Sequence, residues 1–444
     1  MARDLTAHLL RRATFGPTAD EVDAAVRAGF DATLDRLLNP AGDDHGAAAT
    51  PAPQLGPDPR ATLDRSAGRE QRQQANRRRT EQVRQLTYWW LDRMVAAEHQ
   101  LVEKLVFFWH GHWATSVQKV RSAQLMLGQL DTLRRHGRGG FDSLVAAMVR
   151  DPALILWLDG EKNTRRAPNE NLARELMELF TLGIGHYTED DVKAGARALT
   201  GWTVARDTGV AGFNPKRHDR GPKTILGRTD RFDADSYARL LAARPETAGY
   251  VHGRLWLRFA GTEPVPAAPA GDTGAPLDAT GTAKPVDVTA ALRAIFTDPA
   301  FGQSRGHLVK QPVEWAVGAM RQLGVRPSAF SDQQRRQLLS GLSGMDQLPL
   351  RPPSVGGWPA GPAWLTTSAL QARMRLAELF AAAASPAAVQ RLDSTPEADR
   401  LDALARLLVV DTWTDRSRAA LTPLAGRTQR LIAAGLVSPE YTVS

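Results

Sequence analysis

Two glutamates with the spacing of helix neighbours stand in residues 168–202, PNENLARELMELFTLGIGHYTEDDVKAGARALTGW. In a helix that turns about 100° per residue, the polar side chains share one arc opposite an apolar arc; they are Asn171, Arg174, Glu175 and Glu178. Because Glu175 and Glu178 are neighbours on that face, their repulsion would raise the pKa of one of them. Such a pair suits general acid–base catalysis or metal binding. Arg174 would hold one carboxylate ionised or bind an anionic substrate.

The same two arcs are typical of any amphipathic surface helix, so the pattern alone leaves a solvated face as the alternative. The neighbouring residues predict a helical hairpin. Asn169 is a good N-cap, Gly183 a good helix stop, and Thr188 with Asp191 resembles a capping box for a second helix. We expect any active site of this chain to lie on this hairpin.

A histidine pair stands in residues 107–116, FFWHGHWATS, where His110 and His112 flank a glycine. In an extended segment, residues i and i+2 point the same way, so both imidazoles could meet one ligand. The bulky aromatic neighbours would partly desolvate them, which favours the neutral imidazole that binds metals. A pair of structural histidines is the alternative, since His-x-His is common by chance.

Residues 213–227, FNPKRHDRGPKTILG, form a loop that carries His218, Asp219 and Lys223 between glycines. Loops carry functional groups more often than cores do, so we expect His218 and Lys223 to bind the substrate. Neighbouring residues usually point apart, however, which weakens the idea that Asp219 orients His218.

Three more side chains could contact a substrate. Lys310 precedes a helix that begins at Pro312 and could reach an anion, although helix capping is the simpler interpretation. Trp202 and Trp358 could stack on a sugar ring; for Trp358, packing as a lid over the core explains the sequence equally well.

Helical periodicity dominates the chain and predicts a mainly α fold: a multi-helix globular core with long irregular loops and few or no strands. Residues 203–235 lack the helical period and predict a long loop, possibly with short strands. The expected helical segments are residues 29–39, 64–97, 98–109, 142–158, the two arms of the hairpin, 236–260, and most of the chain after 286.

A low-complexity stretch divides this pattern. Residues 261–286, GTEPVPAAPAGDTGAPLDATGTAKPV, predict a linker or insertion. We therefore expect a helical core over residues 1–260, which carries the histidine pair and the hairpin, and a C-terminal helical part over residues 287–444 that packs on it.

Composition excludes several kinds of site. The 444 residues include no cysteine, so disulfides, thiolate metal sites and a cysteine nucleophile are excluded. The net charge of +8 comes mostly from arginines that are spread along the chain and mixed with acids, which makes nucleic acid an unlikely partner. No run of about 18 apolar residues predicts a membrane span. The N-terminus lacks the apolar stretch of a secretion signal, which predicts a cytoplasmic protein unless a partner exports it.

The order of several motifs resembles one bacterial family of unknown function, DUF1800. The motifs are HLLRRATFGPT, FFWHGHWATS, the NENLARELMELFTLG block with its continuation to Trp202, HDRGPKTILG, KQPVEW and PPSVGGWP. The resemblance covers nearly the whole chain. Its pattern includes the two histidines and the following hairpin residues as they stand here: Asn169, Glu170, Asn171, Arg174, Glu175, Glu178, Gly183, Thr200, Gly201 and Trp202.

The resemblance implies an uncharacterised activity and says little about the reaction. Family members are often exported and encoded beside a second uncharacterised family that resembles sulfatases, which implies a sulfatase-like partner protein. A family signature on the polar face of one helix also favours a functional role for that face over simple packing.

Taken together, the sequence predicts an enzyme, a hydrolase or lyase that acts on a polymeric carbohydrate or a similar polar substrate. Glu175 and Glu178, with His110, would supply the acid and the base. Asn171, Arg174, Trp202, His218, Lys223 and Lys310 would bind the substrate. Two alternatives stay open: a metal-dependent enzyme that binds a divalent ion through His110, His112, Glu175 and perhaps His218, and a non-catalytic binding partner of a secreted enzyme.

Overall fold

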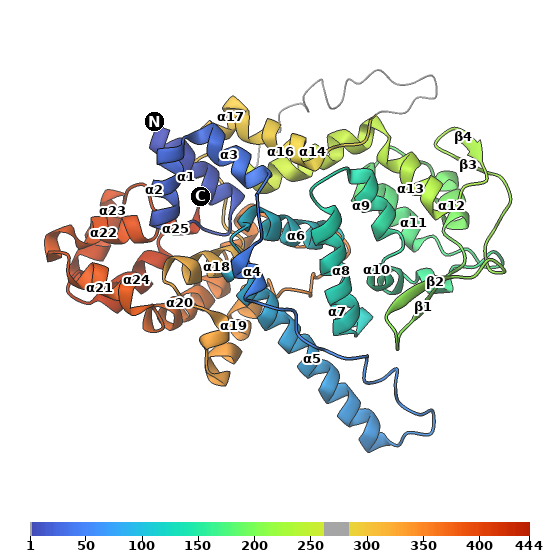
Figure 1. Ribbon diagram of the computed structural model, residues 1–444, viewed down its shortest axis with the longest axis horizontal. Helices are drawn as coiled ribbons and strands as arrows, with labels where there is room; N and C mark the ends of the chain where they lie inside the picture. Colours follow the sequence, from blue (N-terminus) through green and yellow to red (C-terminus); the bar gives the residue numbers. More distant parts are fainter. Residues whose placement is uncertain (1, 262–283) are drawn as a thin grey trace.

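The computed structural model describes residues 2–261 and 284–444, and it is mainly α-helical, as predicted (Figure 1). The chain begins with three short helices that pack on one another, α1 (Ala2–Ala13), α2 (Ala19–Ala28) and α3 (Phe30–Leu38). The single turn α4 (His45–Ala48) follows these three helices. Within the described ranges, no helix is both long enough and apolar enough to cross a membrane.

The long helix α5 (Arg69–Ala96) changes character along its length. Its arginine-rich first half is exposed and extends away from the rest of the molecule (Figure 1). Its second half is buried from Val83 onward and leads into the core through Trp89 and Trp90. The Trp89 indole donates a hydrogen bond of 3.0 Å to the Thr50 carbonyl, which ties the α4 region to this helix.

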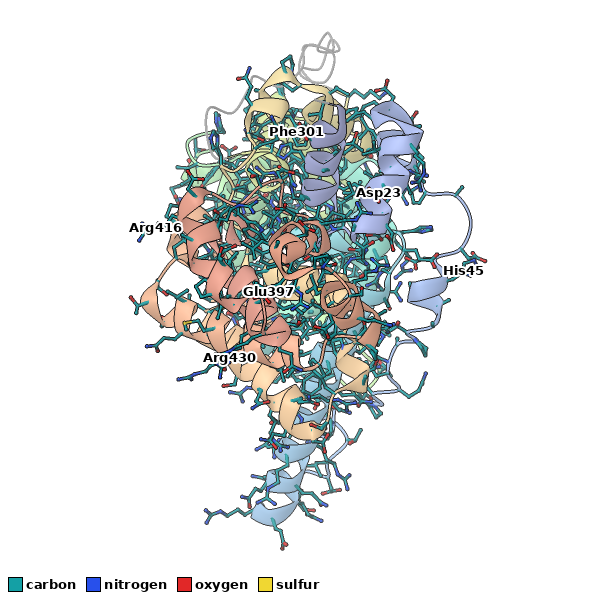
Figure 2. All side chains as sticks on the ribbon, turned by 90° about the vertical axis from the view of Figure 1, so that its left-hand side faces the viewer. Asp23, His45, Phe301, Glu397, Arg416 and Arg430 are labelled. Atoms are coloured by element: carbon teal, nitrogen blue, oxygen red, sulfur yellow. The ribbon has the colours of Figure 1, made fainter. Side chains whose placement is uncertain are left out.

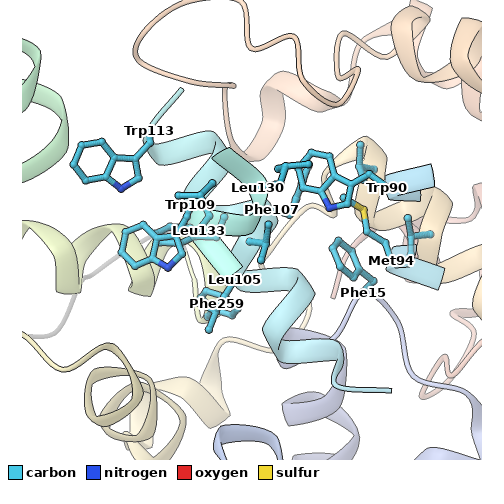
Figure 3. Close-up of a cluster of buried hydrophobic side chains, with 14 of the residues drawn as sticks. Phe15, Trp90, Met94, Leu105, Phe107, Trp109, Trp113, Leu130, Leu133 and Phe259 are labelled. Carbon is cyan, nitrogen blue, oxygen red and sulfur yellow. The ribbon is translucent and has the colours of Figure 1, made fainter. Parts of the chain in front are cut away.

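The central helix is α6 (Gln100–His112), which is buried along nearly its whole length. Its aromatic residues form the middle of a large apolar cluster with side chains from α5, α8 and α14, as Figure 3 shows for Trp90, Phe107, Trp109, Leu130 and Phe259. The helices that follow it pack around this cluster: α7 (Val117–Val120), α8 (Ala123–His136), α9 (Phe141–Met148) and α10 (Pro152–Trp157).

The predicted hairpin is present, with one irregularity. Its first arm is α11 (Asn171–Glu175), which continues directly into a π-helical turn, η2 (Leu176–Thr181), and ends at Gly183, where φ is +85°. Its second arm is α12 (Glu189–Ala198), which begins with the expected capping box between Thr188 and Asp191. The π turn was not predicted, although such turns are frequent at functional sites.

Two small antiparallel ribbons follow the hairpin, within the segment where short strands were thought possible. β1 (Trp202–Ala205) pairs with β2 (Val210–Phe213), and β3 (Lys223–Ile225) pairs with β4 (Arg228–Asp230). The expected helix over 236–260 is in fact two helices, α13 (Ala234–Ala242) and α14 (Pro245–Phe259). A proline lacks the N–H that would continue a helix but suits its first turn, so Pro245 starts the second one.

The part after residue 284 is again helical. It comprises α16 (Val288–Thr297), α17 (Pro299–Gln303), α18 (Pro312–Gln322), α19 (Asp332–Gly344), α20 (Thr367–Ala382), α21 (Pro386–Asp393), α22 (Arg400–Leu407), α23 (Asp415–Leu421), α24 (Thr428–Val437) and α25 (Pro439–Thr442). Short 3-10 turns stand at η1 (Gly160–Lys162), η3 (Pro327–Ala329), η4 (Gly361–Trp364), η5 (Glu397–Asp399) and η6 (Thr422–Leu424).

The N-terminal helices pack against the C-terminal ones. Arg11 forms an ion pair of 2.7 Å with Asp411, and Arg406 pairs with Asp23. Figure 2 looks at this end of the molecule, where Asp23 of α2 and the C-terminal residues Glu397 and Arg416 are labelled. The predicted division at 261–286 stays a prediction, since residues 262–283 lie outside the described residues.

Candidate functional site

The histidine pair lies at the end of a helix and not in an extended segment. Because α6 continues through Gly111 to His112, residues two apart point in different directions around the helix axis. The expectation that both imidazoles face one ligand is therefore wrong. Glycine is a weak helix former, but the apolar residues before the pair bury this helix almost completely. Tertiary packing therefore keeps the helix intact through Gly111.

His110 is completely buried and holds a loop of the C-terminal part. Its Nε2 accepts a hydrogen bond of 3.2 Å from the Leu350 N–H, so the ring proton lies on Nδ1, which has no partner. The rings of Trp90 and Trp358 pack edge-on against it at 5.3 and 5.4 Å. Burial lowers the pKa of His110 to about 3. A neutral imidazole with its acceptor nitrogen occupied positions the loop and is not free to act as a base.

His112 has the opposite tautomer. Its Nε2 lies 3.0 Å from the Phe180 carbonyl, which can only accept, so the proton is on Nε2 and Nδ1 keeps a free lone pair. Burial and the nearby Arg254 lower its pKa to about 3. The histidine motif and the hairpin thus lie within hydrogen-bonding distance of each other, as a shared active site would require. The contact is made by a backbone carbonyl of η2 and not by a carboxylate.

The two carboxylates of the hairpin are partly buried and differ in their surroundings. Glu178 accepts a short hydrogen bond from the Tyr187 hydroxyl. Glu175 makes no hydrogen bond or ion pair with any of the described residues. Burial and the neighbouring Glu178 raise the pKa of Glu175, with Arg174 acting in the opposite direction. The sequence-based expectation that one carboxyl of this pair has a raised pKa agrees with this arrangement.

The remaining polar residues of the hairpin are surface residues. Arg174 donates two hydrogen bonds of 2.7 Å to Glu189 on α12 and one of 3.1 Å to Glu170. It therefore links the two arms of the hairpin. Asn171 is exposed, and its N–H donates to the Asn169 side chain at the start of α11.

The predicted substrate-binding residues of the ribbon region make internal contacts. The His218 Nδ1 lies 3.0 Å from the Thr200 carbonyl and 3.1 Å from its hydroxyl. The buried Lys223 ammonium donates to the carbonyls of Asp219 and Gly221 at 2.7 and 2.9 Å. Trp202 is half-buried and packs against Phe213. These contacts attach the ribbons to the end of α12.

Lys310 lies in a different place from the hairpin. Its Nζ is 3.8 Å from the centre of the Tyr441 ring, and its side chain lines a cavity of about 950 Å³ next to the C-terminal helices. Burial and the charge of Arg11 lower the pKa of Lys310 to about 7. The structure does not bring Lys310 together with Glu175 or Glu178.

The proposed metal ligands are not assembled either. Within residues 2–261 and 284–444, no three His, Asp, Glu or Cys side chains lie close enough together to hold an ion. His110 faces Leu350, His112 faces Phe180, and His218 faces Thr200. The set of His110, His112 and Glu175 therefore offers no common coordination point.

A small cavity that the sequence did not reveal lies beside His112. It has a volume of about 100 Å³ and is lined by α6, α14, the start of α18 and the loop that carries Trp358. Arg254, Arg258 and Gln311 contribute its polar groups. Tyr250, Arg254 and Arg258 follow at intervals of four residues, so they share one face of α14. That spacing is visible in YVHGRLWLRF and is the one signal that could have found these arginines.

The loop over this cavity is held in place by strained backbone. Leu350 has a φ of +68°, which is unusual for a side chain of its size. Its N–H donates to His110 and its carbonyl accepts from the Val117 N–H at 2.9 Å. Gly357 has a φ of +85°, and a β-carbon there would collide with the Gly111 carbonyl. These contacts fix Trp358, which stacks on Phe107 at 5.9 Å.

Beneath the cavity lies a buried cluster of charges. Lys104 and Arg258 form ion pairs of 2.7 and 2.6 Å with the two oxygens of Glu314. The Lys104 ammonium also donates to the carbonyls of Arg12 and Thr14. Arg12 donates to the Ser304 carbonyl at 2.7 Å. One buried carboxylate therefore pairs with two cationic side chains, and its charge also acts on Arg12.

Tyr250 connects the cavity with the carboxylates of the hairpin. Its hydroxyl donates to the Leu179 carbonyl at 2.9 Å, and its ring lies 6.2 Å from that of His112. Burial and Glu178 raise the pKa of Tyr250, and Arg254 opposes them, so both charges are felt at this ring. Tyr250 thus lies between the ring of His112 and the π turn that carries Glu178.

Comparison with known proteins identifies the family and nothing more specific. No curated protein and no solved structure matches the chain. The sequence model of one family, described as a protein of unknown function (DUF1800), matches residues 8–443. That match spans every motif described above, from the N-terminal helices to the last turn, and the chain therefore belongs to the DUF1800 family.

Proposed function

We propose that this protein is an enzyme, a hydrolase or lyase that acts on a polymeric carbohydrate or a similar polar substrate by acid–base catalysis. The observation that carries the proposal is the unequal pair of carboxyls on the hairpin. Glu175 has no partner among the described residues and a raised pKa, whereas Glu178 is fixed by Tyr187. When two neighbouring carboxyls have such different surroundings, one can serve as the acid and the other as the base.

Glu175 is the general acid of this proposal. A protonated Glu175 gives its proton to the leaving oxygen of the substrate, and partial burial keeps a larger fraction of it protonated near neutral pH. The Glu178 carboxylate, oriented by the Tyr187 hydroxyl, takes a proton from water in a hydrolase or from carbon in a lyase. His112 offers a neutral Nδ1 lone pair as a second acceptor.

A binding role without catalysis is the second candidate. Asn171 is exposed, and Arg174 is engaged by Glu189 on the open side of the hairpin. These residues present a surface to a partner and not a cleft to a substrate. A partner of this kind, such as a sulfatase-like enzyme, would dock on the face of α11.

The test compares Glu175→Gln and Glu178→Gln with a matched exposed control, Glu378→Gln on α20. Each protein is incubated with neutral, uronate-containing and sulfated polysaccharides. Reducing ends are counted to detect hydrolysis, and ultraviolet absorbance of unsaturated products detects a lyase. We expect wild-type cleavage of at least one polymer and a loss of about 100-fold or more in Glu175→Gln, the usual contribution of general acid catalysis.

The pH profile separates a catalytic role from a structural one. Activity should fall as the pH rises through the raised pKa of Glu175, because the acid must be protonated. Glu178→Gln removes one cause of that shift, so the alkaline limb of any residual activity should move to lower pH. Full activity of Glu175→Gln on a polymer that the wild type cleaves would overturn the proposal. Cleavage of no polymer at all would favour the binding role.

A further inference from the structure

The buried charges beneath the cavity are unbalanced. Arg12, Lys104 and Arg258 are 1%, 2% and 8% exposed, and Glu314, at 5%, is the carboxylate that pairs with two of them. Burial lowers the pKa of Lys104 to about 8 and that of Arg12 to about 9, so both stay cationic at pH 7. Buried charges are costly unless they are paired. This cluster therefore carries a net positive charge that the described residues do not neutralise.

Some of the unused hydrogen-bond donors of this region belong to residues that line the cavity. Arg258 lines the cavity, is more than nine-tenths buried, and has an Nη2 atom without a partner. Arg254 lines it as well and makes no ion pair or hydrogen bond with any of the described residues. The Trp358 indole N–H is also buried without a partner. Three residues with unused donors, two of them charged, thus line a space of about 100 Å³.

We propose that this cavity binds the oxyanion of a carboxylate, sulfate or phosphate group on the substrate, with Arg254 and Arg258 as its ligands. Guanidinium groups recognise such oxygens through charge-assisted hydrogen bonds. An oxyanion here satisfies the open Arg258 nitrogen and offsets the positive charge of the cluster. A space of this volume suits a single anionic group and excludes a whole sugar ring.

His112 adds a second element of recognition. Its Nδ1 lone pair has no partner, and the residue lines the same cavity. Because a neutral Nδ1 acceptor repels an anion but accepts from a hydroxyl, it selects an anionic group with a hydroxyl nearby. Uronates and sugar sulfates have this combination. The inference rests on the proposed function, because it names an acidic polymer as the substrate class of the same region.

The experiment measures binding and not catalysis. Isothermal titration at pH 7 follows the binding of sodium sulfate, phosphate, acetate and glucuronate at constant ionic strength, with chloride as the balancing ion. Wild type is compared with Arg254→Gln, which loses no ion pair with the described residues, and with Arg336→Gln, at an exposed arginine of α19. Trp358→Phe keeps an aromatic ring, although a smaller one, and removes the indole donor.

We expect saturable binding of at least one oxyanion by the wild type and by Arg336→Gln. Arg254→Gln should weaken it about tenfold or more, since one hydrogen bond between charged groups is worth at least that factor. Trp358→Phe should weaken it several-fold. Glucuronate should bind more tightly than acetate if His112 accepts from a hydroxyl, and the ranking of sulfate against phosphate identifies the group.

Two results would overturn the inference: no saturable binding of any of these anions by the wild type, or equal loss in Arg254→Gln and Arg336→Gln. The failure of this inference can be distinguished from the failure of the acid–base proposal. Glu175→Gln should bind the anion within about twofold of wild type. If Glu175→Gln abolishes cleavage while no anion binds, this inference fails and the acid–base proposal stands. If an anion binds and Glu175→Gln stays fully active, the acid–base proposal fails and this inference stands.

Discussion

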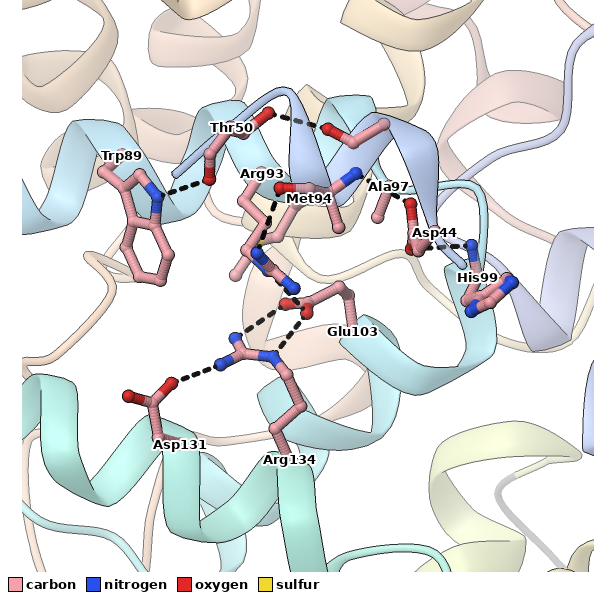
Figure 4. Close-up of polar contacts among 12 residues, drawn as sticks. Asp44, Thr50, Trp89, Arg93, Met94, Ala97, His99, Glu103, Asp131 and Arg134 are labelled. Carbon is pink, nitrogen blue, oxygen red and sulfur yellow. Dashed lines mark hydrogen bonds and ion pairs between the residues drawn. The ribbon is translucent and has the colours of Figure 1, made fainter. Parts of the chain in front are cut away.

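Glu103 and Lys104 are consecutive residues of α6, yet they belong to two buried charge clusters of opposite character. Glu103 accepts hydrogen bonds of 2.8 Å from Arg93 and 2.6 Å from Arg134, and Arg134 also pairs with Asp131 at 2.8 Å (Figure 4). Two cations meet two carboxylates there, and the formal charges cancel. On the other side of the helix, Lys104 joins a cluster whose single carboxylate, Glu314, faces several cations.

The difference teaches how a structural charge cluster can be told from a candidate site. No side-chain nitrogen or oxygen of the Glu103 cluster is buried without a partner. The Lys104 cluster leaves nitrogens of Arg12 and Arg258 unpartnered and lies next to a cavity. Strongly perturbed charges that lie beside a cavity favour function over packing. The balanced cluster holds three helices together, and the unbalanced one borders a cavity through Arg258.

The largest change in stability is expected when the central carboxylate of each cluster, Glu314 or Glu103, is removed. Burial would raise the pKa of Glu314, but Arg258 and Lys104 lower it to about 2. Glu314→Gln leaves buried cations without a counter-charge and should destabilise the fold by about 3–5 kcal/mol. Glu103→Gln should cost about 1–3 kcal/mol, because Arg93 keeps the Ala47 carbonyl and Arg134 keeps Asp131. Urea denaturation measures both.

Added sulfate sharpens the result, since any general salting effect acts on both variants alike. If the Lys104 cluster is an anion site, sulfate at constant ionic strength should restore more stability to Glu314→Gln than to Glu103→Gln. Equal restoration, or a larger cost for Glu103→Gln in buffer, would contradict the distinction between the clusters.

A second, smaller effect concerns the loop that covers the unbalanced cluster. Gly357→Ala places a β-carbon against the Gly111 carbonyl at a φ of +85° and should destabilise the fold by about 1–3 kcal/mol. It should also weaken sulfate binding by displacing Trp358. The matched change Gly111→Ala meets only the Trp358 ring, at 3.7 Å, and should alter stability by less than about 1 kcal/mol. Thermal denaturation measures the stability of both variants. Equal losses of stability would show that the loop can move to accommodate a β-carbon at residue 357.

The smallest effect is expected on the exposed face of the hairpin. Arg174→Gln removes the links to Glu189 and Glu170, whose side chains are 64% and 39% exposed. Exposed ion pairs contribute little because water and salt screen them, so the melting temperature should change by no more than about 2 °C. A larger shift, measured by circular dichroism, would show that this surface cluster matters to the fold as much as a buried one.

The sequence by itself determined the helical character of the chain and the two arms of the hairpin. Apolar periodicity predicted a mainly α fold and the hairpin, and the cap residues Thr188 and Gly183 predicted where its arms begin and end. These signals are local, because capping and periodicity depend on residues within a few positions of one another. The same reasoning predicted that Glu175 and Glu178 influence each other, since residues three apart in a helix are always neighbours.

Tertiary structure decided everything that depends on distant segments. Whether His110 and His112 face one ligand depended on where the buried helix α6 ends. Packing extends this helix through both residues, so their side chains point in different directions. The π turn depended on its surroundings in the same way. The arginine cavity joins His112, Arg254, Gln311 and Trp358 across nearly 250 positions of sequence. Charge balance and cavity shape depend on residues that are distant in sequence. Composition therefore gave the net charge of +8, but only the fold showed where buried positive charge lacks a counter-charge.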